Sequence, residues 1–298
     1  MSPIARNVSD LAHLLDVMVG YDPEDPLTAA GVGKYSGSYM RFLDKNGLKG
    51  ARIGILREPI GDNSEPQSED FKKVDAVFDK DVAELKAAGA IIVENVEIPG
   101  GWKASLAKLG TSGDPGPNDE AMRRYLARNP NSPFKTREDI AKSPLIDQMY
   151  PNPPAPERRN SGVVWKPLPP PDFARYGQYM KARDQLMINI LKLMADNGLD
   201  AIVHKTVEHQ PTLIKDGINP PYITGKGMPS INTPLRYLAA MTVPSGFTTD
   251  NLPVGITFLG RPYSEPTLLK LAYAYEQSTH HRRPPKTTPA LAASAARP

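Results

Sequence analysis

Two serine-containing stretches combine residue types that could support nucleophilic chemistry. Ser36-Gly37-Ser38 lies between two tyrosines, and Ser245 follows an apolar run and precedes Gly246. A serine nucleophile on a strand-to-helix turn requires the pattern Gly-x-Ser-x-Gly, but Val243 occupies its first position here. The other stretch lacks the flanking glycines that would let backbone N–H groups surround an oxyanion. We therefore interpret Ser245 as part of a tight turn and assign no catalytic residue in either stretch.

A second group of residues could bind a metal ion or transfer a proton. His204, Glu208 and His209 are close in sequence, but histidines five positions apart do not share a helical face, and they form no His-Glu-x-x-His motif. We therefore expect a polar loop and no metal site. Lys205 follows a predicted strand, where a desolvated lysine could act as a base. The alternative, which we favour, is that Lys205 points to solvent.

Apolar periodicity predicts the elements that would position these residues. We expect helices over residues 8–18, 69–88 and 176–197 and a last helix capped by Ser264, with strands over residues 51–56, 91–93, 200–204, 240–243 and 254–259. The strand, helix and strand over residues 51–93 form a βαβ unit, whose strands are usually parallel. The pattern therefore predicts an α/β fold.

Two segments depart from this pattern. The region from about residue 99 to 175 is rich in proline, with short helices expected at residues 120–127 and 136–142. A segment of this length can be a binding loop or lid, but we favour a solvated insertion. His280 and His281 precede a segment over residues 282–298, which is rich in Pro, Ala and basic residues. We expect this tail to be disordered and both histidines to be solvated.

Composition restricts the classes to which the chain can belong. The net charge is +3 without a basic stripe interleaved with aromatic residues, so we expect no nucleic-acid partner. The 298 residues include no cysteine, which excludes disulfides and thiolate nucleophiles. Residues 1–10 lack the apolar core of a signal peptide, and no apolar run approaches the ~20 residues of a membrane span. We therefore expect a cytoplasmic protein without a membrane partner.

Several stretches, taken in order, resemble the amidase-signature family over nearly the whole chain. They are Ser-Pro-Ile-Ala-Arg-Asn-Val-Ser-Asp at 2–10, Leu-Lys-Gly-Ala-Arg-Ile-Gly-Ile at 48–55, Gly-Leu-Asp-Ala-Ile-Val at 198–203, Thr-Val-Pro-Ser-Gly-Phe at 242–247, Leu-Pro-Val-Gly-Ile at 252–256 and Ala-Tyr-Glu-Gln at 274–277. Ser2 replaces the glycine with which the family's first segment begins. The resemblance implies the C-terminal part of the amidase-signature fold, an α/β fold with a mixed central sheet flanked by helices.

The family's chemistry is hydrolysis of carboxylic amides by a nucleophilic serine, a second serine that relays protons and a lysine base, with no cofactor or metal. In the family these residues precede the segment that here starts at Ser2, so we transfer no catalytic residue. By the same resemblance, loops after the late strands help to form the substrate pocket, which makes Thr206, Asn232, Thr233 and Pro234 candidate pocket residues. Family members often carry Pro-Thr where this chain has Lys205-Thr206.

These observations lead to two hypotheses about function. In the first, residues 1–281 are a partial amidase-signature domain that does not hydrolyse amides alone, either because the gene product is truncated or because its N-terminal part is supplied separately. Its partner would be a small-molecule amide, once an N-terminal portion completes the site. In the second, the chain is a non-catalytic binding or scaffold protein derived from an amidase. Loss of neighbouring strands would leave a sheet edge open, so we also expect self-association through that edge. The sequence does not support a third hypothesis, a different enzyme in which Ser245 or Lys205 has a new role, because no partner residues lie at the spacing that such a site requires.

Overall fold

The computed structural model describes residues 2–34, 37–109, 118–144, 172–218, 225–229 and 238–287. The chain divides into two compact units. The larger unit comprises Met1–Trp102, Met187–Thr212 and Thr224–Pro298, and the smaller unit comprises Lys103–Leu186 and Leu213–Ile223. The chemistry predicted at residues 204–206 and 245 therefore falls in the larger unit.

A mixed sheet of five strands forms the centre of the larger unit. In spatial order the strands are β3 (Ile91–Val93), β1 (Arg52–Ile55), β4 (Ala201–Lys205), β7 (Pro253–Leu259) and β6 (Ala240–Phe247). β1 pairs in parallel with β3 and β4, whereas β7 pairs antiparallel with β4 and β6. The predicted α/β fold and its mixed central sheet are confirmed.

The strands differ in burial according to their place in the sheet. Every residue of the central strand β4 is buried. Burial is expected of its first three residues, Ala-Ile-Val, which are apolar, but not of the two polar residues, His204 and Lys205, that follow them. β6 alternates between exposed and buried positions over its first six residues. Such alternation is typical of a strand that is covered on one face. Among the described residues β6 pairs with β7 alone, so β6 is an edge strand.

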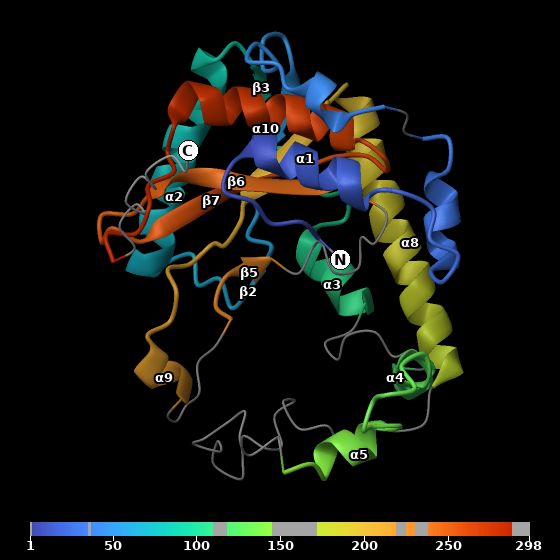
Figure 1. Ribbon diagram of the computed structural model, residues 1–298. Coiled ribbons are helices and arrows are strands. Elements are labelled where there is room, and N and C mark those ends of the chain that lie inside the picture. Colours follow the sequence, from blue (N-terminus) through green and yellow to red (C-terminus); the bar gives the residue numbers. More distant parts are fainter. Residues whose placement is uncertain are drawn as a thin grey trace, which may run out of the picture. The chain divides into compact units, whose positions relative to one another are not determined.

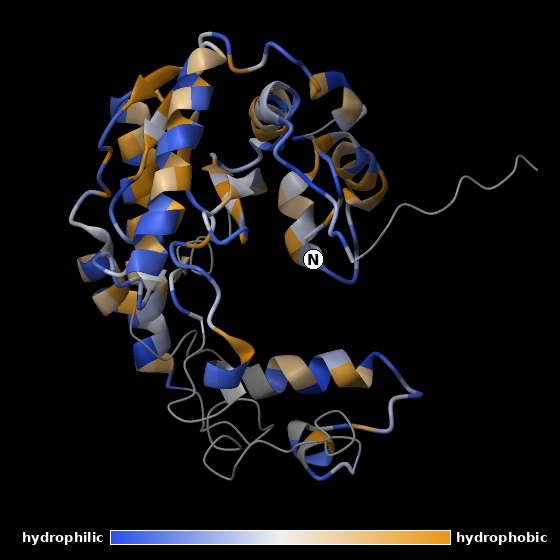
Figure 2. Cartoon of the chain, turned by 90° about the vertical axis from the view of Figure 1, so that its left-hand side faces the viewer, coloured by the Kyte–Doolittle hydropathy of each residue, from blue (hydrophilic) through white to orange (hydrophobic). Residues whose placement is uncertain are grey.

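Two helices pack on this sheet, and a third packs on one of these helices. They are α1 (Val8–Met18), α2 (Glu69–Ala87) and α10 (Glu265–Thr279). α10 contacts β6, β7 and α1, and α2 contacts β4, β6 and β7 (Figure 1). Hydrophobic and hydrophilic residues alternate in bands along the helices (Figure 2). Their apolar sides join the sheet in one core, which includes Ile53, Phe78, Val203, Phe258, Leu271 and Tyr275.

Local sequence explains where these helices begin. The Asn7 side chain accepts a hydrogen bond from the backbone N–H of Asp10, and the Ser68 side chain does the same for Phe71, so each caps its helix as expected of these residue types. The last helix begins after its predicted N-cap residue, Ser264, but the side chain of that serine does not make the capping hydrogen bond. The Ser264 hydroxyl donates instead to the carbonyl of Arg261.

The remaining elements are short, apart from one long helix. They are η1 (Pro26–Gly31), η2 (Tyr39–Phe42), β2 (Gly61–Asp62), α3 (Trp102–Leu109), α4 (Asn118–Ala127), α5 (Arg137–Ala141), α8 (Phe173–Asp196), α9 (Ile214–Ile218) and β5 (Met228–Pro229). The short helices expected in the proline-rich region are confirmed as α4 and α5. Thr136 and Asp139 start α5 with a reciprocal capping box. In the described part of the chain, no helix has the length and apolar character needed to cross a membrane.

Candidate functional site

The end of β4 carries two of the residues singled out from the sequence. Lys205 is only 2% exposed, and its Nζ lies 2.7 Å from Asp75 Oδ1 and 4.2 Å from the centre of the Phe71 ring. The lysine therefore does not point to solvent, contrary to the favoured interpretation. An ammonium group that is held between a carboxylate and an aromatic face is typical of a structural ion pair.

Thr206 lies at the end of a chain of hydroxyl groups that crosses three neighbouring strands. Its Oγ1 is 2.8 Å from Thr257 Oγ1 on β7, which in turn is 2.9 Å from Thr242 Oγ1 on β6. Gly255 packs beside this chain, because a Cβ at that position would lie 2.9 Å from Thr206 Oγ1. The three hydroxyls satisfy one another and fix the rotamers of Thr206 and Thr242.

Thr206 and Thr242 both line a pocket in the larger unit. Its volume is about 470 Å³, and its mostly apolar wall includes Val74, Val243, Leu252 and Val254. Cavities of this size with apolar walls and a few placed polar groups are typical of small-molecule sites. Lys205 does not line the pocket. Asn232, Thr233 and Pro234 lie outside the described residues.

The wall formed by residues 206–211 is held in place by Glu208. Its buried carboxylate accepts hydrogen bonds from the backbone N–H groups of Ile60, at 2.8 Å, and Gly61, at 3.0 Å, and from the Ser64 hydroxyl. A carboxylate that accepts several hydrogen bonds holds its position firmly. Sequence analysis considered Glu208 only as a companion of the histidines, because Ile60 and Ser64 are more than 140 residues away.

Polar contacts also orient the next two residues of this wall. His209 Nδ1 is 2.7 Å from the carbonyl oxygen of Gln210. The Gln210 amide donates to Asp70 Oδ1 at 2.8 Å and to Asp250 Oδ2 at 2.9 Å. Asp250 also pairs with Lys73, at 2.6 Å. Gln210, which lines the pocket, is thus fixed between α2 and the turn after β6.

The residues considered for a metal site near β4 do not converge. His204 is buried, its Nδ1 lies 2.8 Å from the carbonyl oxygen of Lys205, and its Nε2 has no hydrogen-bond partner among the described residues. Burial lowers the pKa of His204 to about 4. Since Glu208 binds backbone N–H groups, it is not available as a ligand together with these histidines.

The two serine-containing stretches lie in different surroundings, and Ser245 is part of a strand instead of the predicted tight turn. Ser245 is wholly buried on β6, at a register shift between Pro244 and Gly246. Ser38 accepts a hydrogen bond from the backbone N–H of Met40 and donates to Asp16. Ser36 lies outside the described residues.

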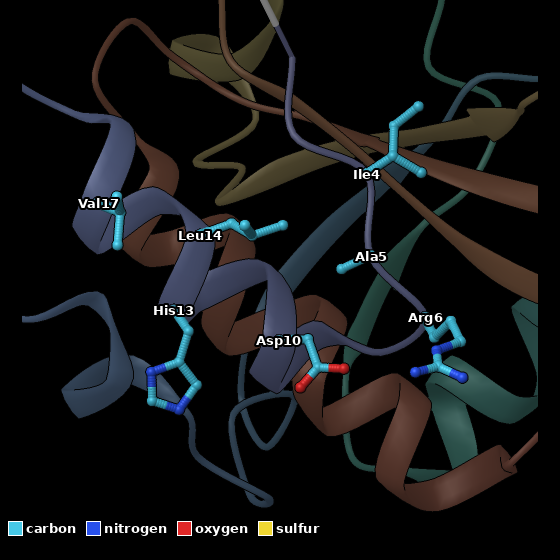
Figure 3. A pocket seen from close by; sticks show the side chains of 7 residues that line it. All are labelled: Ile4, Ala5, Arg6, Asp10, His13, Leu14 and Val17. Carbon is cyan, nitrogen blue, oxygen red and sulfur yellow. The ribbon is translucent and has the colours of Figure 1, made fainter.

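A second hollow lies on the outer side of α1, where apolar residues are exposed. It has a volume of about 560 Å³, and Figure 3 shows Leu14 pointing toward the segment that carries Ile4 and Ala5. Ile4 is 91% exposed and Val17 is 85% exposed. Arg6, Asp10 and His13 also line the hollow, so its surface combines exposed apolar and polar side chains.

Three comparisons with known proteins agree with one another. The family model described as Amidase matches residues 1–269. A probable amidase of Arabidopsis thaliana is 28% identical over 96% of this chain and 49% of its own length. A putative amidase of Arthroderma benhamiae is 30% identical over 95% of this chain and 46% of its own length. The crystal structure of native peptide amidase from Stenotrophomonas maltophilia, which is 26% identical, superposes with a TM-score of 0.65 over 94% of this chain and 53% of that one.

Proposed function

Since the chain belongs to the amidase family, we propose that it forms the substrate-binding portion of an enzyme that hydrolyses carboxylic amides at the C–N bond. The observation that carries this proposal is the pocket beside Thr206, which lies where two stretches that resemble the family, residues 242–247 and 252–256, meet the segment after β4. The chain spans about half the length of the curated relatives it matches. The activity of a complete enzyme is therefore part of the proposal.

The lining of the pocket suggests how an amide would be held. Apolar side chains such as Val74, Val243 and Leu252 would bury an apolar acyl group, because the area removed from water drives such binding. The Thr206 and Thr242 hydroxyls are positioned through Thr257 and provide the polar groups at this surface. The Glu208 contacts would keep the wall rigid, so little ordering would be needed when the substrate binds.

Acyl transfer also requires a nucleophile, a base and donors that stabilise the oxyanion. We propose that residues beyond these 298 supply all three. Within the described residues, β6 has one unpaired edge and the apolar side chains of Ile4, Leu14 and Val17 are exposed, and both features support this proposal because they favour association. The completing portion would add a strand beside β6 and cover the hollow on α1 (Figure 3).

Binding of an apolar primary amide to the isolated chain tests the role of the pocket. We expect phenylacetamide to bind with a Kd on the order of millimolar, the range of a small fragment, as measured by saturation-transfer NMR. The substitution Val254→Phe fills the pocket and should abolish binding. Val19→Phe makes the same change at an exposed position outside the pocket, and should leave binding unchanged.

Equal binding by the wild type and Val254→Phe would show that the amide does not occupy this pocket. Binding of phenylacetic acid and of a hydrocarbon of the same size with equal affinity would instead favour a non-specific apolar site. That outcome would support the alternative in which the chain is a binding or scaffold protein.

A further inference from the structure

Where α2 meets the end of α10, two carboxylates, a histidine and a tyrosine lie close together in the larger unit. The Tyr275 hydroxyl is 3.0 Å from Asp81 Oδ1 and 3.2 Å from Glu84 Oε2. His281 Nε2 lies 2.7 Å from the same Glu84 oxygen. The donor atoms that Asp81, Glu84 and His281 could offer all lie within 4.8 Å of one another. The pocket beside Thr206 uses none of these residues.

Two polar atoms in and beside this cluster are buried without a hydrogen-bond partner in the described part of the chain. Asp81 is wholly buried, and its Oδ2 has no hydrogen-bond partner among the described residues. Ser245 Oγ is also buried and has no hydrogen bond of acceptable geometry with the described residues. Tyr275 has one proton for two carboxylates, and a neutral His281 has one ring N–H. Buried polar atoms without partners are uncommon, and a bound ion is one way to satisfy them.

We propose that Asp81, Glu84 and His281 bind a divalent transition-metal ion such as Zn²⁺. Two carboxylate oxygens and one imidazole nitrogen are ligands that suit this ion. Two donors bound at about 2.1 Å lie at most about 4.2 Å apart, so small side-chain rotations would bring the three atoms into reach. Lys80 Nζ lies 3.6 Å from the other Glu84 oxygen, Oε1, so this lysine does not occupy the Oε2 atom that faces Tyr275 and His281.

The ion would act as a structural clamp. Asp81 and Glu84 are on α2, whereas His281 follows the end of α10, where His280 adopts a left-handed conformation with φ of 50°. One ion bound to all three would fix the segment after α10 to α2. Binding to the folded chain alone stabilises that state by mass action. This arrangement could not be predicted from the sequence, because about 200 residues separate the two acids from His281.

Thermal unfolding with and without Zn²⁺ tests the clamp. After treatment with EDTA, we expect the midpoint of the wild type to rise by about 5 °C at a hundredfold excess of ZnCl₂ over Kd, and MgCl₂ to have no effect. Glu84→Gln and His281→Gln should lose the rise. His280→Asn removes the neighbouring exposed histidine and keeps a residue that tolerates its left-handed conformation, so it should respond like the wild type.

A rise that persists in His281→Gln, or no rise in the wild type, would overturn the proposal. Absorption of the unsubstituted chain loaded with Co²⁺ gives a second readout that needs no variant. Intense visible d–d bands, typical of Co²⁺ with four or five ligands, would support the clamp if one equivalent of Zn²⁺ removes them by displacing the Co²⁺. If Co²⁺ gives only the spectrum of the hydrated ion, the clamp does not exist.

Discussion

At the scale of single residues, the burial of His204 inside β4 makes the free energy of unfolding depend on pH. Burial lowers its pKa to about 4, against 6.5 for an exposed histidine, so the folded state keeps it neutral. Between these values the unfolded state binds a proton that the folded state does not. The free energy of unfolding therefore falls as the pH drops from 6.5 toward 4, by about 3 kcal/mol from this group.

The substitution His204→Leu should remove this contribution. We expect its free energy of unfolding, measured with urea between pH 4 and 7, to vary less with pH than that of the wild type. Other titrating groups are common to both proteins, so the difference between the two curves isolates His204. Parallel curves would show that His204 is not held neutral by burial.

Glu208 shows which site residues the sequence could not reveal. Thr206 was predicted from the resemblance after the late strand, and it does line a pocket. Glu208 fixes the same wall, but its role depends on Ile60, Gly61 and Ser64, which the fold brings to it from a distant part of the chain. Local patterns report an amphipathic face or a cap. They cannot report a partner 148 residues away.

At the scale of elements, local sequence predicted most of the larger unit. The helices α1 and α2 and the strands β1, β3, β4 and β7 lie within a residue or two of their predicted bounds. Their periodicity and caps act over a few residues, so the pattern can be read directly. β6 extends to Phe247, beyond the predicted end at residue 243, because pairing with β7 continues past the register shift near Pro244. Tertiary pairing of this kind overrides local propensity.

The edge of β6 leads to a prediction about association. An uncovered edge offers unpaired backbone groups to another chain, so we expect the isolated protein to self-associate as its concentration rises. Ala240 is exposed on this strand, and Ala240→Lys should reduce the association seen by sedimentation velocity, since a charged edge resists pairing. Ala83→Lys adds the same charge at an exposed position of α2 and serves as the control. Equal association by both variants would locate the contact elsewhere.

At the scale of the whole molecule, we proposed that this chain binds the substrate and that residues beyond it supply the nucleophile. This proposal predicts how the 298 residues behave alone. The folded chain should melt cooperatively and take no label from a fluorophosphonate probe for activated serines. The peptide amidase of Stenotrophomonas maltophilia, treated in the same way, is the comparison protein. No label is expected because the chain would bind substrate without holding the nucleophile. Stoichiometric labelling of one of its serines, mapped by mass spectrometry, would contradict this proposal and identify the nucleophile.

The position of β4 between β1 and β7 also has a consequence for how the protein folds. The contact between Arg52 at the start of β1 and Asp200 before β4 joins residues 148 positions apart. The parallel pair therefore closes only after β4, which ends at Lys205, has left the ribosome. Closing so large a loop costs chain entropy before the contact repays it, and sheets with such distant partners form slowly. Until then the apolar strand β1 can pair only with β3, and its other edge is exposed. During synthesis the chain therefore risks aggregation through that edge unless a chaperone covers it.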